Sequence, residues 1–259
     1  MDVVEAPGPL RPEDRSVLSR PAPGPDLVLR YGAADEHVCD VRLGGPRAAG
    51  RPLVVLLHGG FWRPEYDRVH VRPMTDALAR AGWTTATPEY RRIPGRPDAM
   101  VADVRAALRE VRRSDVTTAH SDGRLLVAGH SAGGHLALLA AAGAPAGVVG
   151  VLALAPVADL EVAAALALDT DAVPAFLGGP AAGRADLDPA RLATPDARVH
   201  IVHGTGDGIV PAVVSESYRR RHPAAALTAL PVGHFALIDP SSTAWPVVLG
   251  ALDGLAAPA

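Results

Sequence analysis

The chain has 259 residues, 48% of them hydrophobic, which suits one large domain or two small ones with a sizeable core. Its formal net charge of −3 at pH 7 is nearly balanced and gives no indication of a nucleic acid or an anionic membrane surface as a partner. All 25 basic residues are arginine and there is one cysteine, which excludes a Schiff-base lysine, a P-loop lysine and an internal disulfide framework.

The N-terminal stretch differs in composition from the rest. Residues 1–25 are rich in proline, glycine and charge and predict a loosely held arm before a domain of residues 26–259. No charged start is followed by an apolar stretch, so we expect no signal peptide. No uninterrupted apolar run reaches the roughly 18 residues of a membrane span. The expectation is a cytoplasmic protein without a membrane partner.

From about residue 26, apolar runs with β-branched residues alternate with segments of helical periodicity. The predicted strands are 27–31, 37–43, 52–58, 83–90, 125–130, 148–157, 197–204 and 226–232. The predicted helices are 71–81, 98–114 and 131–143. Buried strands alternating with helices predict an α/β fold, with a mostly parallel sheet of about eight strands covered by helices on both faces. Residues 159–196 lack a clean strand and predict a short helical lid over one end of the sheet.

The strongest motif is GHSAG at 129–133, which matches G-x-S-x-G between a predicted strand and a predicted helix. This context favours a nucleophile elbow, in which the turn holds Ser131 in a strained conformation and requires small flanking residues. The alternative is a glycine-rich turn with a capping serine. We therefore predict Ser131 as the nucleophile.

A serine nucleophile needs a base to take its proton, and the chain has ten histidines. Site residues in such a sheet gather at the carboxyl ends of the strands. His234 follows the last predicted strand, whereas His222 precedes it and therefore lies at the wrong end. His130 and His135 flank the elbow and are expected to pack or to form hydrogen bonds. His234 is the predicted base, with a solvated loop histidine as the alternative.

The base needs a carboxylate to orient it. Asp207, in HGTGDGIVP, follows a predicted strand and lies between Ser131 and His234 in the chain. The order Ser, Asp, His is the one expected for α/β-hydrolases. Asp159, also at the carboxyl end of a strand, is the second candidate. Asp239 is too close to His234 along the chain.

These motifs support a family resemblance. HGGFW at 58–62, GHSAGG, HGTGD and GHF, in this order, resemble the α/β-hydrolase fold superfamily. HGG followed by an aromatic residue and Trp is similar to the kynurenine formamidase (arylformamidase) and small carboxylesterase branch, and EYR at 89–91 agrees. The resemblance covers about residues 31–239. It implies an α/β-hydrolase fold and an oxyanion hole formed by backbone N–H groups of Gly60 or Phe61 and of Ala132.

The same resemblance suggests the substrate pocket. Phe61, Trp62 and His130 are its expected lining, with core packing as the alternative for Trp62. No cofactor is expected, and no metal site, because the sequence has no H-E-x-x-H motif and no histidine cluster with ligand spacing.

The leading hypothesis is a serine hydrolase that cleaves a small-molecule carboxylic ester, or an N-formyl or aryl amide, through an acyl-enzyme. A small-peptide hydrolase of the acylaminoacyl or dipeptidyl peptidase kind needs the same triad, as does an acyltransferase. A non-catalytic binding protein on the same fold is a further alternative, and a metal-dependent hydrolase is the weakest one. The sequence leaves open which substrate is cleaved and whether the chain forms a homodimer.

Overall fold

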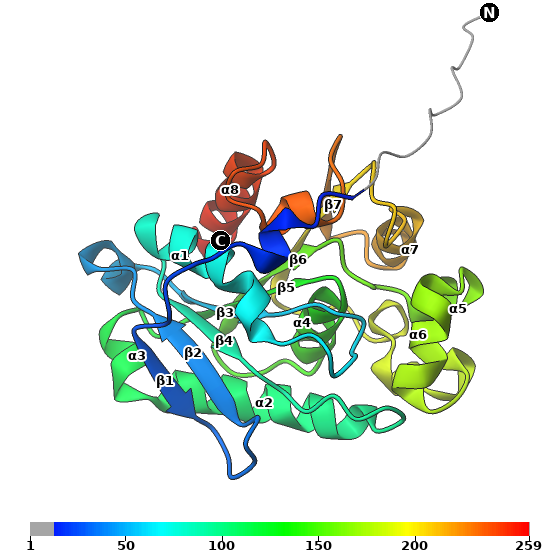
Figure 1. Cartoon of the computed structure of the whole chain (residues 1–259), viewed down its shortest axis with the longest axis horizontal. Helices are drawn as coiled ribbons and strands as arrows, with labels where there is room; N and C mark the ends of the chain where they lie inside the picture. The colour runs from blue at the N-terminus through cyan, green and yellow to red at the C-terminus, as the bar shows by residue number, and fades with distance from the viewer. Residues whose placement is uncertain (1–12, 259) are drawn as a thin grey trace, which may run out of the picture.

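The computed structural model describes residues 13–258, which contain an eight-stranded sheet in the order β1-β2-β4-β3-β5-β6-β7-β8 (Figure 1). β1 and β2 pair antiparallel, as do β2 and β4, and the remaining pairs are parallel. The strands are β1 Leu27–Arg30, β2 Val38–Arg42, β3 Leu53–Leu57, β4 Thr85–Pro88, β5 Leu125–His130, β6 Val148–Leu154, β7 Arg198–Gly204 and β8 Ala226–Leu230. The predicted mostly parallel sheet is confirmed.

Helices cover both faces of this sheet. They are α1 Arg72–Arg80, α2 Pro97–Arg113, α3 Asp115–Ala119, α4 Ala132–Ala142, α5 Leu160–Ala165, α6 Leu168–Leu177, α7 Val213–Arg221 and α8 Trp245–Ala256. Apolar residues of α1 and α8 share one core cluster, and those of α2, α4 and α7 share the other. Figure 1 shows α1 and α8 together on one side of the molecule and α2 on the opposite side. α3, α7 and α8 are not among the predicted helices.

The central strand β3 explains why the sheet has a core on each face. Its five residues, LVVLL, are all buried. Val54 and Leu56 join the cluster with α1 and α8, whereas Leu53, Val55 and Leu57 join the cluster with α2 and α4. This alternation follows from the period of two in a strand, and a strand covered on both sides needs a continuous apolar run.

The segment between β6 and β7 carries the predicted insertion. It contains α5, α6 and three short 3-10 turns at Ala181–Gly183, Ala185–Leu187 and Pro189–Arg191. α6 begins irregularly, because Asp169, Thr170 and Asp171 have positive φ angles. The role of this segment as a lid stays a prediction.

The described part of the N-terminal arm is not loosely held. A 3-10 helix at Ser16–Ser19 places Val17, only 1% exposed, in the core cluster of α1 and α8. Arg20 pairs with Asp239 through a hydrogen bond of 2.8 Å from Nη2 to Oδ2. Val17, with Leu18 packed beside the same cluster and the Arg20 pair, therefore anchors the segment, and overall composition gives no sign of these contacts. Residues 1–12 of the predicted arm lie outside the described residues.

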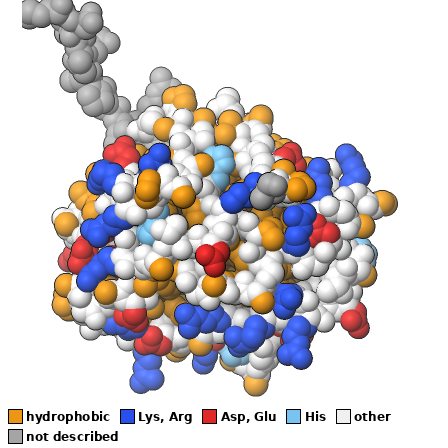
Figure 2. Space-filling view, turned by 180° about the vertical axis from the view of Figure 1, so that it is seen from behind, with side chains coloured by type: hydrophobic (Ala, Val, Ile, Leu, Met, Phe, Trp, Pro, Cys, Tyr) orange, Lys and Arg blue, Asp and Glu red, His pale blue; other side chains and the backbone are white. Residues whose placement is uncertain are grey.

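The distribution of charged side chains on the surface agrees with the nearly balanced net charge. On the face shown in Figure 2, arginines are interspersed with acidic, apolar and uncharged side chains. Among residues 13–258, every helix is too short or too polar to cross a bilayer.

Candidate active site

Ser131 lies at a tight turn between β5 and α4, with φ 57° and ψ −119°. Positive φ is costly for a residue with a side chain and persists only where the surroundings hold it. A Cβ atom on Gly129 would lie 2.1 Å from the carbonyl oxygen of Gly133, and one on Gly133 would lie 2.1 Å from that of Leu57. The two glycines therefore let strand, turn and helix approach closely, and the turn has the geometry that the GHSAG motif predicts.

His234 and Asp207 form a close pair on two neighbouring loops. Nδ1 of His234 lies 2.6 Å from Oδ2 of Asp207, and both residues are buried. Oδ1 of Asp207 accepts hydrogen bonds of 2.8 Å from the N–H groups of Ile209 and Val210. Burial alone would raise the pKa of Asp207, but hydrogen bonds from His203 and His234 lower it below its usual range. A carboxylate this close to Nδ1 favours the tautomer that carries its proton there, and the role of His234 as the base stays a prediction.

Ser131 and His234 line the same cavity of about 300 Å³. The cavity also collects residues from the N-terminal segment, from the loop after β3 and from the loops after β7 and β8. Its other lining residues are Arg15, Leu18, Gly60, Phe61, Tyr66, His70, His130, Asp169, Gly208, Ile209 and Phe235. The predicted nucleophile and base are thus brought together at the carboxyl ends of the strands.

The residues predicted for the oxyanion hole come from two places, the loop after β3 and the first turn of α4. Gly60, with φ 110°, and Phe61, with φ 47°, line the cavity. A Cβ atom on Gly60 would lie 2.4 Å from Cβ of Tyr66, so the backbone there requires glycine. Ala132 is buried and is the first residue of α4, where the backbone N–H groups have no partner within the helix. Their role at an oxyanion stays a prediction.

Comparisons with known proteins agree with this architecture. A family model described as BD-FAE matches residues 39–166. Esterase B from Lactobacillus rhamnosis superposes with a TM-score of 0.74 at 22% identity, over 93% of this chain and 90% of that one. A truncated carbohydrate esterase from gut microbiota gives 0.73 at 17% identity, over 90% and 98%. The chain has the α/β-hydrolase fold. Esterase 2 from Thermogutta terrifontis gives 0.70 at 20% identity, over 93% and 99%. No curated protein gives a significant sequence match.

The α/β-hydrolase fold presents the nucleophile on an elbow, followed in the chain by the acid and then by the histidine. Ser131, Asp207 and His234 have this order and lie on the loops after β5, β7 and β8. The three residues are far apart in the sequence but close in space, because these strands end at the same edge of the sheet.

Trp62 does not line the cavity that contains Ser131, contrary to the prediction. It is 4% exposed and stacks on Phe176 of α6, with the ring centroids 4.4 Å apart. Its edge also meets His135, at 5.2 Å. Trp62 thus anchors the loop after β3 to the insertion, the core-packing alternative. Phe61, its neighbour, lines the cavity, and its contact with a substrate stays a prediction.

His130 also lines the cavity, but it is almost fully buried, and its contact with a substrate stays a prediction. Its Nε2 donates to the carbonyl oxygen of His234 at 3.2 Å. Burial, followed by the proximity of His234, lowers the pKa of His130 well below its usual value. The ring is therefore neutral near pH 7 and supports the loop of His234.

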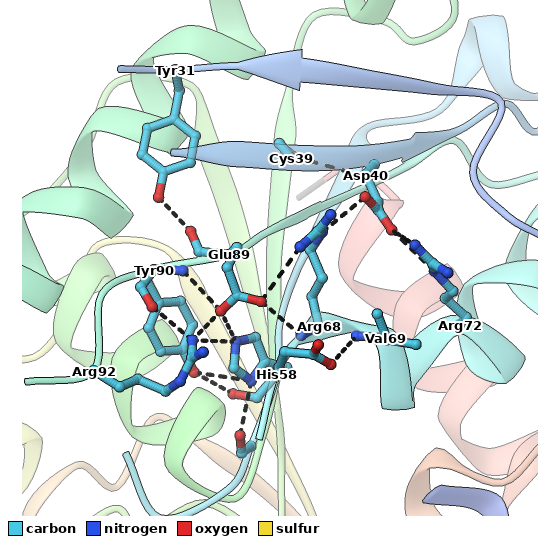
Figure 3. A network of polar contacts seen from close by, with 12 residues as sticks. Tyr31, Cys39, Asp40, His58, Arg68, Val69, Arg72, Glu89, Tyr90 and Arg92 are labelled. Atoms are coloured by element: carbon cyan, nitrogen blue, oxygen red, sulfur yellow. Dashed lines mark hydrogen bonds and ion pairs between the residues drawn. The ribbon is translucent and has the colours of Figure 1, made fainter. Parts of the chain in front are cut away.

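A buried ionic network around His58 holds the start of the HGG loop (Figure 3). Nε2 of His58 lies 3.0 Å from Oε1 of Glu89, and the hydroxyl of Tyr90 donates to the carbonyl oxygen of His58 at 2.7 Å. Oε2 of Glu89 accepts from the N–H of Arg68 at 3.0 Å, and Arg92 pairs with the same carboxylate. Burial would raise the pKa of Glu89, but hydrogen bonding and charge from His58 lower it below its usual range. The network fixes the start of the loop that carries Gly60.

Asp159, the second candidate acid, does not contact His234. Its Oδ1 accepts from the N–H of Val162 at 3.0 Å and caps α5, and its Oδ2 accepts from the hydroxyl of Ser217 at 2.6 Å. Asp239 pairs instead with Arg20. Of the three candidate carboxylates, Asp207 is the one that contacts His234.

Several cavity residues were not predicted. Ile209 and Phe235 closely follow Asp207 and His234 in the sequence, and that proximity could have indicated them. Arg15 and Leu18 give no sequence signal. Among residues 13–258, no group of three or more His, Cys, Asp or Glu side chains is arranged to hold a metal ion.

Proposed function

We propose that this α/β-hydrolase cleaves a carboxylic ester of a small molecule through an acyl-enzyme on Ser131. The observation that carries the proposal is the 2.6 Å contact between His234 and Asp207 beside a cavity that also contains the strained Ser131. A hydroxyl becomes an effective nucleophile when an oriented imidazole takes its proton.

The chemistry follows from these positions. Oγ of Ser131 attacks the ester carbonyl while Nε2 of His234 takes the hydroxyl proton. His234 then gives this proton to the departing alcohol as the C–O bond breaks, leaving the acyl group on Ser131. Water attacks the acyl-enzyme with His234 again as the base, which releases the acid. Asp207 stays ionised and stabilises the imidazolium.

The alkoxide in each tetrahedral intermediate requires fixed donors. The N–H groups of Gly60 or Phe61 and of Ala132 are suited to this role, because a preformed donor contributes about 3–4 kcal/mol in a water-poor site. Gly60 and Phe61 already line the cavity, and the network around His58 and Glu89 fixes their loop.

Two observations support ester cleavage. Phe61, Leu18, Ile209 and Phe235 give the cavity apolar walls, which suit a short acyl or aryl group. Two structures of the same fold are described as inhibited by a tributyrin phosphonate and as phosphoramylated by tabun. The same groups could cleave an N-formyl or aryl amide, which HGGFW at 58–62 suggests by resemblance.

Active-site labelling tests the mechanism. We expect a fluorophosphonate probe to label the wild type once, and Ser131→Ala to lose both the label and ester turnover by roughly 10⁴-fold or more. Ser121→Ala is the matched control, because its hydroxyl makes only local bonds, to the carbonyl of Thr117 at 2.8 Å and from the N–H of Gly123 at 3.4 Å. Folded wild-type protein that takes no label and turns over no ester would instead favour a binding protein.

A substrate panel tests the subclass. Short p-nitrophenyl esters, N-formylkynurenine and aminoacyl arylamides all react by acyl transfer, but they differ in the acyl group and in the leaving group. We expect kcat/KM to be highest for a short ester, because the cavity is small. A hundredfold preference for N-formylkynurenine or for an arylamide would replace the esterase assignment with an amidase or a peptidase.

A further inference from the structure

We propose that Glu13 is a positioning residue that ties the loop of Asp207 to the loop of His234, so that the N-terminal segment completes the catalytic centre. This inference rests on the proposed function, because it assigns a role within the same site. Glu13 does not line the cavity and therefore acts through the residues that do.

One carboxylate contacts both loops. Oε1 of Glu13 accepts a hydrogen bond of 3.0 Å from the N–H of Gly208, the residue after Asp207. Oε2 accepts one of 2.8 Å from the N–H of His234 itself. Hydrogen bonds to an ionised acceptor are about twice as strong as neutral ones. The bridge spans 195 residues to one loop and 221 to the other.

Space for this carboxylate exists because residue 233 is glycine. A Cβ atom on Gly233 would lie 2.4 Å from Oε2 of Glu13. The two loops also meet directly, since the N–H of Gly206 donates to the carbonyl oxygen of Val232 at 3.1 Å. Glu13 thus occupies a site where the loops are close and where a side chain on the second loop would exclude it.

The segment that carries Glu13 is itself anchored. Val17 is buried in the core, and Arg20 pairs with Asp239, which follows the His234 loop. The Arg15 guanidinium lies 5.4 Å from the centre of the Phe235 ring, within the range of a cation–π contact. These contacts restrict the segment, so the Glu13 side chain loses little further conformational freedom when it bonds to the two loops.

The bridge matters because the acid and the base belong to different strands. Asp207 follows β7, and His234 follows β8, which pairs with β7 alone in the described sheet. A misplacement of about 1 Å in a catalytic group can cost about 100-fold in rate. Losing the bridge should therefore lower kcat by about 10- to 100-fold. KM should stay nearly unchanged, because Glu13 does not line the cavity.

Steady-state kinetics of Glu13→Ala and Glu13→Gln test this expectation. Gln keeps one accepting oxygen but places an NH₂ group against the second N–H donor, so its kcat should also fall. Asp14→Asn is the matched control, because Asp14 is exposed and accepts only a local bond from the N–H of Ser16, at 2.9 Å. Gly233→Ala should reproduce the loss of kcat with the carboxylate still present, because its methyl group displaces Glu13.

A spectroscopic readout separates positioning from stability. The proton between Nδ1 of His234 and Asp207 should give a downfield proton NMR signal in the wild type. We expect this signal to broaden or shift in Glu13→Gln while the circular dichroism spectrum stays unchanged. Wild-type kcat and an unchanged signal in folded Glu13→Gln would overturn the proposal. If Ser131→Ala kept its activity, the hydrolase mechanism would fail, but the NMR signal would still test Glu13.

Discussion

At the residue scale, Asp207 and Asp159 show how two carboxylates at strand ends take different roles. Asp207 accepts two backbone N–H groups through one oxygen and contacts His234 through the other. Asp159 caps α5 and accepts from Ser217. Their sequence contexts are alike, so the distinction depends on which loop faces each side chain.

This distinction leads to a matched pair of substitutions. Asp207→Asn should lower kcat by about 10³- to 10⁴-fold, less than Ser131→Ala, because the amide no longer fixes the tautomer of His234. Asp159→Asn keeps a capping oxygen for α5 and should leave kcat within about twofold. Rates of ester hydrolysis measured on both variants decide between the acids. A severe loss at Asp159 with a mild one at Asp207 would reverse the assignment.

At the element scale, α4 packs closely against β3 just after the nucleophile, at Gly133. Gly133→Ala places a methyl group 2.1 Å from the carbonyl oxygen of Leu57, so we expect a loss of at least about 3 kcal/mol in the free energy of unfolding, or failure to fold. Gly254→Ala in α8 is the control. Nothing lies within 4 Å of a Cβ atom added there, and alanine should stabilise the helix by about 0.5–1 kcal/mol. Urea unfolding measures both.

The elements also show what the sequence could predict. The eight strands lie within the predicted ranges because their burial requires apolar runs, and α2 follows from its apolar face. α8 is apolar on most of its circumference, and α7 is mostly polar, so neither has the periodicity of an amphipathic helix. Trp62 could not be placed, because its partner Phe176 lies in an insertion that no pattern orients.

The same contrast holds for the site. GHSAG and the order Ser131, Asp207, His234 could be predicted because strand ends define one edge of the sheet. Glu13 and Arg15 could not be, because their contacts join residues about 200 positions apart. Composition suggested a loose arm, but the described part of the arm is anchored by the buried side chain of Val17.

At the scale of the whole molecule, buried neutral histidines should make stability depend on pH. Burial lowers the pKa of His70 and of His135 to about 4. The unfolded chain therefore binds more protons than the folded one between about pH 6.5 and 4, and stability falls as the pH drops through this window. Fully buried His135 contributes up to about 3 kcal/mol of this loss.

Ionised carboxylates extend the same trend to lower pH. Glu89 and Asp207 have lowered pKa values, so their stabilisation is present above the unfolded value of about 4 and is lost as the pH falls below it. Urea unfolding from pH 8 to 3 should show a plateau near neutrality followed by a continuous decline. His135→Gln should flatten the decline between pH 6.5 and 4, and constant stability from pH 7 to 4 in the wild type would contradict this account.

The contact between Glu13 and His234 also has a consequence during protein synthesis. Glu13 leaves the ribosome before the His234 loop, which follows 221 residues later. The nucleophile turn at Ser131 is complete well before that. A nascent chain can therefore contain the serine without its base, and the full rate that we propose for the site is reached only when the Glu13 segment and the His234 loop have met.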